Sequence, residues 1–224
     1  MDKVINLGIP HVGELIFESI DTPGLIQFFL VSETWKVLAE NVLIERWKGR
    51  MFEACKSGET KIVQLVLERC NSEELGLNTK DKDGLTTFMW ACRKRHTDVV
   101  KLLLNHSKSN IELNAKDTDE HTGIILTRRN RHNKDVVKLV LDLSDSIIDL
   151  NARTNTGWTA FMWACRSGCE DLVKLLMDHS DPIVELNGTN ELGWNAVMTA
   201  GRFGHKDVDQ LLLDDMKSNQ EMDA

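Results

Sequence analysis

Cysteine, histidine and carboxylate side chains are the residues of this sequence best able to carry chemistry. The five cysteines and seven histidines are scattered along the chain. Cys165, Cys169 and His205 can be drawn as zinc ligands, but no C-x-x-C pair supports such a site. No glycine-rich phosphate loop follows an expected strand, and no serine or cysteine has a base at a suggestive spacing. The sequence therefore predicts no catalytic residue, no metal and no cofactor, and we expect a protein that is not an enzyme.

Composition narrows the class of protein further. The chain has 224 residues, of which 42% are apolar and 28% charged, so it can bury a core. Its net charge of −8 argues against nucleic acid as a partner, and no apolar stretch is long enough for a membrane span. The start lacks the pattern of a signal peptide, and the odd number of scattered cysteines is typical of reduced thiols. We expect the protein in the cytoplasm or the nucleus.

A repeat of 36 or 37 residues organises most of the chain. A Leu-Asn pair recurs at Leu77-Asn78, Leu113-Asn114, Leu150-Asn151 and Leu186-Asn187. Each pair is followed by a short polar stretch, and then by Thr or Asn at the start of an apolar run. A second apolar run with i, i+3, i+4 spacing comes next, as in 98–104 and 171–177. Each unit is thus predicted to hold two short helices and a polar turn.

This pattern resembles the ankyrin repeat, whose T-P-L-H-x-A opening is present here as T-x-F-M-W-A at 86–91 and 159–164. The resemblance covers residues 48–213 and implies an all-α solenoid of about four to five helix pairs. The period is longer than usual because the loop after the second helix is longer. Residues 214–224 are expected to form an acidic, frayed tail.

The repeat assigns structural roles to several residues that otherwise suggest chemistry. Cys92 and Cys165 occupy one small-residue slot, so we interpret them as buried packing thiols. His96, His132 and His205 share a slot between the two helices, which implies loop hydrogen bonds by resemblance to the family. The third unit departs from the pattern at 128–132, where three arginines and a histidine are either a solvated segment or a basic site for an acidic partner.

Residues 1–47 lack the repeat and are expected to form three short helices. Leu30-Val31-Ser32 followed by Trp35-Lys36 resembles the F-box, a segment that docks on the adaptor subunit of an SCF-type ubiquitin ligase. The alternative is that these helices only cap the first repeat. By the resemblance, the adaptor-binding residues are Pro10, Leu15, Ile16, Ile20, Leu25, Leu30, Val31 and Trp35.

The resemblance to ankyrin repeats also implies a binding surface along the first helices and the turns. The side chains expected to contact a protein substrate are Leu85, Arg93, Lys94, Trp158, Arg166, Ser167, Trp194, Arg202 and Phe203. Trp90 and Trp163 are repeat-equivalent and are interpreted as packing between repeats. The resulting hypothesis is a substrate-recognition subunit of an SCF-type ubiquitin ligase, and the alternative is a non-enzymatic ankyrin scaffold for protein interactions.

Overall fold

The computed structural model describes residues 51–70, 75–106, 110–127, 134–143, 148–178 and 184–222. Within these ranges the chain forms ten helices and no strand, so the all-α prediction is confirmed. No helix in the described ranges combines the length and the apolar character that crossing a bilayer requires.

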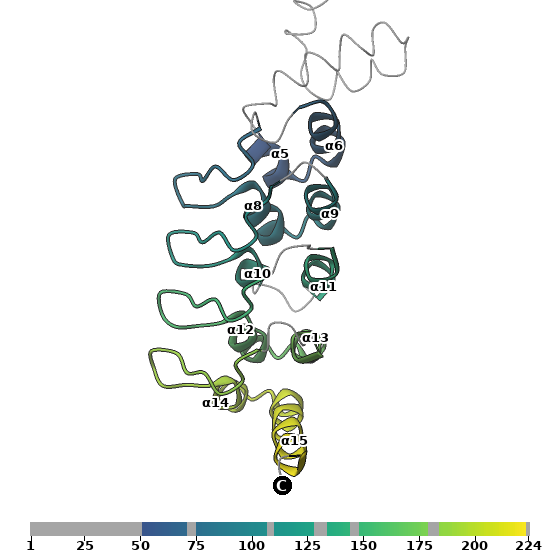
Figure 1. Ribbon diagram of the computed structural model, residues 1–224. Coiled ribbons are helices and arrows are strands. Elements are labelled where there is room, and N and C mark those ends of the chain that lie inside the picture. The colour runs from purple at the N-terminus through teal and green to yellow at the C-terminus, as the bar shows by residue number, and fades with distance from the viewer. Residues whose placement is uncertain are drawn as a thin grey trace, which may run out of the picture.

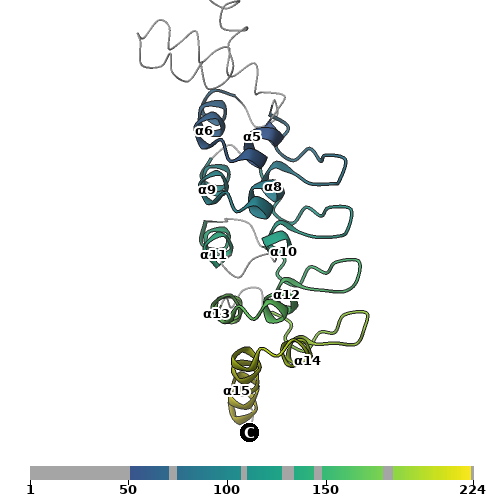
Figure 2. The ribbon, with the colours of Figure 1, turned by 180° about the vertical axis from the view of Figure 1, so that it is seen from behind.

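The helices form five pairs stacked into an elongated array (Figure 1). One column holds the first helix of each pair, and we call these the inner helices: α5 (Met51–Ser57), α8 (Thr87–Lys94), α10 (Gly123–Leu126), α12 (Ala160–Ser167) and α14 (Ala196–Arg202). The other column holds the outer helices: α6 (Thr60–Arg69), α9 (Thr97–Asn105), α11 (Lys134–Leu143), α13 (Glu170–Asp178) and α15 (Lys206–Met222). Figure 2 shows the same two columns from behind, with the hairpin loops projecting beside the inner helices. Five pairs agree with the predicted four to five.

The Thr or Asn before each apolar run is a helix cap. Thr86 accepts a hydrogen bond from the backbone N–H of Met89 at the start of α8. Thr122, Thr159 and Asn195 do the same for α10, α12 and α14. These side-chain oxygens satisfy N–H groups that have no partner within the helix, which fixes where each inner helix begins.

The recurring Leu-Asn pair joins each repeat to the next one. Its leucine packs into the core, as at Leu77 and Leu150, which are 3% and 2% exposed. Its asparagine oxygen accepts a backbone hydrogen bond from the following repeat, and the donors are Glu112 to Asn78, Asp149 to Asn114 and Glu185 to Asn151, at 2.8–2.9 Å. The period therefore reflects a contact between repeats as well as packing within one.

The hairpin tips also form a continuous ladder along the array. Backbone N–H groups of Thr118, Asn155 and Glu191 donate to the carbonyl oxygens of Asp83, Asp119 and Thr156 in the preceding hairpin, at 3.2–3.3 Å. Close approach of the tips requires glycine at two of these hairpins. A Cβ on Gly84 would lie 2.8 Å from the Thr118 nitrogen, and one on Gly157 would lie 3.0 Å from Asn190 Cα.

The cysteines lie in the core, which confirms the packing interpretation of Cys92 and Cys165. Both are 0% exposed, as is Cys55 in the equivalent slot of the first pair. Burial raises the pKa of the Cys55 and Cys165 thiols to about 12 and raises the pKa of Cys92 as well. Thiols held neutral in this way are poor nucleophiles and poor metal ligands.

The histidine slot between the helices also has the structural role that was expected. The Nε2 atoms of His96 and His205 lie 3.1 and 2.8 Å from the carbonyl oxygens of Lys56 and Arg166, each in the preceding repeat. Each ring lies against the glycine that ends the preceding inner helix, for example Gly168 beside His205. His132 and the basic segment 128–132 lie outside the described residues.

The end of the array differs from the expectation. Residues 214–222 continue α15, a helix of 17 residues, where the sequence predicted a frayed tail. The other outer helices have nine or ten residues. No turn interrupts α15, and its last turns therefore extend beyond the length shared by the other outer helices.

Candidate protein-binding surface

The tryptophan of α8 lies between a carboxylate and a group of cations. Trp90 Nε1 donates a hydrogen bond of 2.8 Å to Asp81 Oδ2 in the hairpin before it. Lys56 Nζ lies 4.5 Å from the centre of the Trp90 ring, and Arg93 and Lys94 lie 5.2 and 5.9 Å from it. These distances are those of cation–π contacts, so the positive charges are held at the ends of α5 and α8.

The hydrogen bonds in this hairpin shift the pKa of Asp81. Burial alone raises the pKa of this carboxyl group, but its hydrogen bonds from the Leu85 backbone, the Trp90 ring and the Asp83 backbone, together with the charge of Lys56, outweigh the effect of burial. The net result is a pKa below the ordinary value, so Asp81 is ionised at neutral pH. A charged Asp81 positions both the hairpin and the Trp90 ring.

A second aromatic cluster surrounds Arg166 at the end of α12. The rings of Trp158 and Trp163 lie 4.7 Å apart, centre to centre, with an angle of 31° between their planes. Arg166 Cζ lies 5.2 Å from the Trp158 ring, 4.9 Å from the Trp163 ring and 4.7 Å from the Phe203 ring of the next repeat. One guanidinium group therefore contacts aromatic rings from two adjacent repeats.

Comparison with known protein families identifies the array. The family described as "Ankyrin repeats (3 copies)" matches residues 32–117, 51–146 and 124–223. The chain belongs to the ankyrin-repeat family. The matched ranges include no F-box domain, and the first of them begins inside the predicted F-box-like segment. Ankyrin repeats bind protein partners, so the array is a protein-binding unit.

Curated relatives are similar over a shorter stretch. Osteoclast-stimulating factor 1 of Danio rerio is 41% identical over 66 residues, which cover 30% of this chain and 28% of that protein. The protein of the same name from Monopterus albus is 44% identical over 55 residues, or 25% of this chain and 24% of the relative. The Bos taurus protein is 36% identical over 66 residues, with 30% and 28% covered. The chain thus spans less than a third of the length of these relatives.

Most of the contact residues expected for the ankyrin array are accessible. Lys94, Arg202 and Phe203 are exposed, and Arg93, Arg166, Ser167 and Trp194 are half-buried. Arg202 Cζ lies 5.8 Å from the Trp194 ring, which repeats the pairing of a cation with an aromatic ring in the last repeat. We use the name inner surface for the following residues: Lys56, Trp90, Arg93, Lys94, Trp163, Arg166, Trp194, Arg202 and Phe203.

Two expected contact residues are buried, which corrects their assignment. Leu85 is 1% exposed because it packs with Met89, Trp90 and Leu126 in a small cluster separate from the main core. Trp158 is 6% exposed because Trp163 and Arg166 cover its ring. A partner reaches neither side chain directly, although both support side chains of the inner surface.

The two repeat-equivalent tryptophans have the packing role that was expected. Trp90 is 8% exposed and lies in the same cluster as Leu85, while Trp163 is partly buried and packs against the main core. Sequence reasoning omitted Lys56 from the binding residues. The repeat alignment could have identified it, because Lys56 precedes Arg93 by 37 residues and occupies the same slot.

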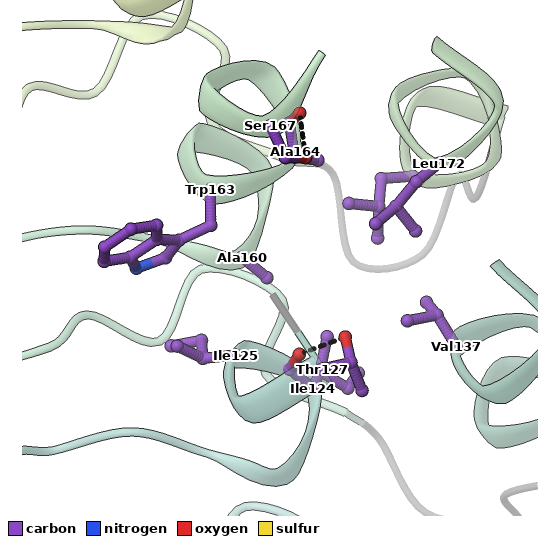
Figure 3. Close-up of a pocket in the computed structure, with 10 residues that line it drawn as sticks. Ile124, Ile125, Thr127, Val137, Ala160, Trp163, Ala164, Ser167 and Leu172 are labelled. Atoms are coloured by element: carbon purple, nitrogen blue, oxygen red, sulfur yellow. Dashed lines mark hydrogen bonds between the residues drawn. The ribbon is translucent and has the colours of Figure 1, made fainter. Parts of the chain in front are cut away.

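Trp163 also lines a small pocket between the third and fourth repeats (Figure 3). Most of its lining is apolar, including Ile124, Ile125 and Ala160. Its two hydroxyl groups are engaged within their own helices, since Thr127 Oγ1 donates to the Ile124 carbonyl and Ser167 Oγ to that of Ala164. The pocket thus presents no nucleophile with a base and no group suited to acid–base chemistry.

One group of possible metal ligands exists in the described ranges. Donor atoms of Asp117, Asp119 and His121 lie within 4.8 Å of one another at a hairpin. Asp117 Oδ1 already accepts hydrogen bonds from the Asp119 and His121 backbones, and the His121 ring lies 3.1 Å from it. This is the turn-forming role that Asp81 has in its own hairpin. Cys165, Cys169 and His205 do not bring three donor atoms together, so the zinc alternative is not supported.

The residues predicted to bind the ligase adaptor belong to a part of the chain that the structure does not describe. All of them precede residue 51, where the described ranges begin. They are Pro10, Leu15, Ile16, Ile20, Leu25, Leu30, Val31 and Trp35. Their role stays a prediction from the sequence.

Proposed function

We propose that this protein is a non-catalytic receptor that binds a partner protein on the inner surface of its ankyrin array. The observation that carries the proposal is the repeated pairing of cations with aromatic rings along the inner helices. Arg166 with Trp163, and Arg93 with Trp90, are equivalent pairs from two repeats. Arg202 beside Trp194 adds another pair in the last repeat.

The tryptophan and arginine side chains of the inner surface are also of the types that contribute most to binding energy. Tryptophan and arginine dominate the energy of protein interfaces, where a central residue contributes about 2 kcal/mol or more. The aromatic contacts restrain the arginine side chains before a partner arrives, so less conformational entropy is lost on binding. A partner that covers Arg166 and Arg202 would also remove the exposed Phe203 ring, which is 41% exposed, from water.

The receptor role is tested by comparing variants of the inner and outer helices. Lys94→Glu/Arg202→Glu reverses two exposed charges of the inner surface, and Lys101→Glu/Lys138→Glu reverses two exposed charges of α9 and α11. We expect proteins captured from a native lysate by the full chain to be lost with the first variant and retained with the second, as measured by quantitative mass spectrometry. Equal capture by both variants would exclude the inner surface as the binding site.

A more specific role follows from the sequence of the first 47 residues. We propose that these residues dock on the adaptor of an SCF-type ubiquitin ligase, so that the array holds a protein for ubiquitination in the cytoplasm or nucleus. The support is the F-box-like pattern Leu30-Val31-Ser32 with Trp35-Lys36. The family match that begins at residue 32 favours the alternative for the overlapping stretch, namely a scaffold whose front helices cap the first repeat.

A binding assay with the purified adaptor distinguishes these two roles. The ligase role predicts that the full chain binds the adaptor and that Leu30→Asp abolishes binding. Leu192→Asp is the matched control, because Leu192 lies at a hairpin tip and is 68% exposed, so an aspartate is tolerated there. Absence of adaptor binding by the wild-type chain would leave the scaffold role alone.

A further inference from the structure

We propose that the segment recognised by the inner surface is an acidic stretch of the partner protein, whose Asp or Glu side chains pair with a column of cations. This inference rests on the proposed receptor function and specifies the chemistry of its partner. The column consists of Lys56, Arg93, Arg166 and Arg202, which occupy the same slot near the end of α5, α8, α12 and α14.

The distribution of charge between the two helix columns supports an acidic partner. The described inner helices contain five basic residues and one acidic residue, Glu53. The outer helices contain eight basic and twelve acidic residues. In a protein of net charge −8, the inner helices are therefore the basic helix column, and the positive charge at their ends favours an acidic segment there.

The cations of the column form no close ion pair with a described carboxylate, although the charge of Lys56 acts on Asp81. Within the described ranges no carboxylate oxygen lies within 4.0 Å of the side-chain nitrogens of Lys56, Arg93, Arg166 or Arg202, whereas cations elsewhere form such pairs. Examples are Lys116 with Glu120 at 2.7 Å and Arg153 with Glu185 at 2.9 Å. The positive charges of the three arginines are thus available to a ligand.

The Arg166 guanidinium donates no hydrogen bond to another described residue. A guanidinium group stacks through its flat face and donates hydrogen bonds in its plane. Trp158, Trp163 and Phe203 contact Arg166 as rings, and no hydrogen bond to its N–H groups is formed in the part of the chain described here. These N–H groups can therefore donate charge-assisted hydrogen bonds to a carboxylate of the partner.

The column extends over several repeats, which favours a segment with more than one acidic residue over a single carboxylate. Arg166 and Arg202 belong to adjacent repeats, and Phe203 from the last repeat contacts Arg166. Two acidic residues of the partner can pair with Arg166 and Arg202. An apolar residue between them can cover the exposed Phe203 ring. Acidic residues with a neighbouring aromatic or aliphatic residue are thus the expected motif.

The experiment is selection from a randomised phage-displayed peptide library against the full chain. We expect the selected peptides to be rich in Asp and Glu and to bind more weakly as salt increases. Arg166→Gln/Arg202→Gln should weaken the best peptide about tenfold or more, because each charge-assisted pair is lost. Lys101→Gln/Lys138→Gln removes the same charge from the outer helices and should change affinity less than about twofold.

Each other outcome overturns the inference in a recognisable way. Neutral or basic peptides that still depend on Trp163 or Phe203 would exclude an acidic partner while leaving the receptor function intact. Peptides whose binding ignores every inner-surface variant would contradict both proposals. A selection without enrichment would exclude recognition of acidic linear segments. Urea midpoints of both double variants, measured alongside, show whether a loss of binding reflects unfolding.

Discussion

Repeats that are followed by another repeat differ from the last repeat, which has no described repeat after it. Both contain the same residue types at equivalent positions, but the surroundings of these residues differ. Met162 of α12 is 1% exposed, whereas the equivalent Met198 of α14 is 56% exposed. A Cβ on Gly168 would lie 2.3 Å from the His205 ring, while one on Gly204 would find no described atom within 4 Å. The difference shows that the neighbouring repeat, rather than the residue itself, determines what each slot contributes to stability.

The largest expected contrast concerns the two methionines. Met162→Ala should lower the free energy of unfolding by about 2–3 kcal/mol, because it leaves a cavity between repeats. Met198→Ala should lower it by less than about 0.5 kcal/mol, because the side chain is already in water. Urea unfolding followed by circular dichroism measures both values. Equal losses would mean that the face of the last repeat is covered in solution.

The two glycines give the next largest contrast. Both have left-handed backbones, with φ of +66° at Gly168 and +75° at Gly204, so alanine at either position costs about 1 kcal/mol in backbone strain. Gly168→Ala also displaces the His205 ring and its contact with the Arg166 carbonyl, which adds about 1 kcal/mol. Thermal unfolding should therefore show a larger drop in Tm for Gly168→Ala, and an equal drop would refute the clash with His205.

The asparagines of the Leu-Asn pairs extend the same comparison to hydrogen bonds. Asn151 accepts a 2.8 Å bond from the Glu185 backbone, while the exposed Asn187 makes no such bond to a described residue. Asn151→Ala should cost about 1 kcal/mol of unfolding free energy, and Asn187→Ala close to none. Hydrogen exchange at the Glu185 amide provides a local readout, since it should accelerate only in Asn151→Ala.

The smallest expected effect concerns Asp81, whose position is occupied by the uncharged Asn190 in the last repeat. The lowered pKa of Asp81 means that its ionised form stabilises the folded chain, so this contribution is present at neutral pH and is lost as pH falls below its ordinary value of 3.8. Asp81→Asn should be less stable than the wild type at pH 7, and the gap should narrow below pH 3.8. Urea unfolding of the wild type and of Asp81→Asn, at pH 7 and below pH 3.8, measures this gap, and a gap that stays constant would contradict the effect.

Much of the fold could be predicted because helix caps and buried positions depend on residue type and on the position within the repeat. The caps at Thr86, Thr159 and Asn195 and the buried cysteines follow from residue type and period alone. The burial of Leu85 and Trp158 could not be predicted, because it depends on side chains that cross between elements, such as Arg166 over Trp158. The continuation of α15 does not follow from composition, because an acidic stretch at the end of a chain is compatible both with a frayed tail and with a helix.

The binding surface was predictable in part for the same reason. Arg93, Arg166 and Arg202 are visible as a repeated slot in the sequence. Their stacking on aromatic rings becomes visible only in three dimensions, because Phe203 and Arg166 come from different repeats. The sequence thus indicates which residues recur, and the structure indicates which of them act together.

Site-specific photo-cross-linking tests the central claim most directly, namely that a partner protein binds the inner surface. Benzoylphenylalanine is placed at Lys94, an exposed residue at the end of α8, and in a second variant at Lys101, an exposed residue of the outer helix α9. We predict that the protein captured by the wild-type chain cross-links from position 94 and not from position 101. Cross-linking from position 101 alone, or equally from both, would contradict the account.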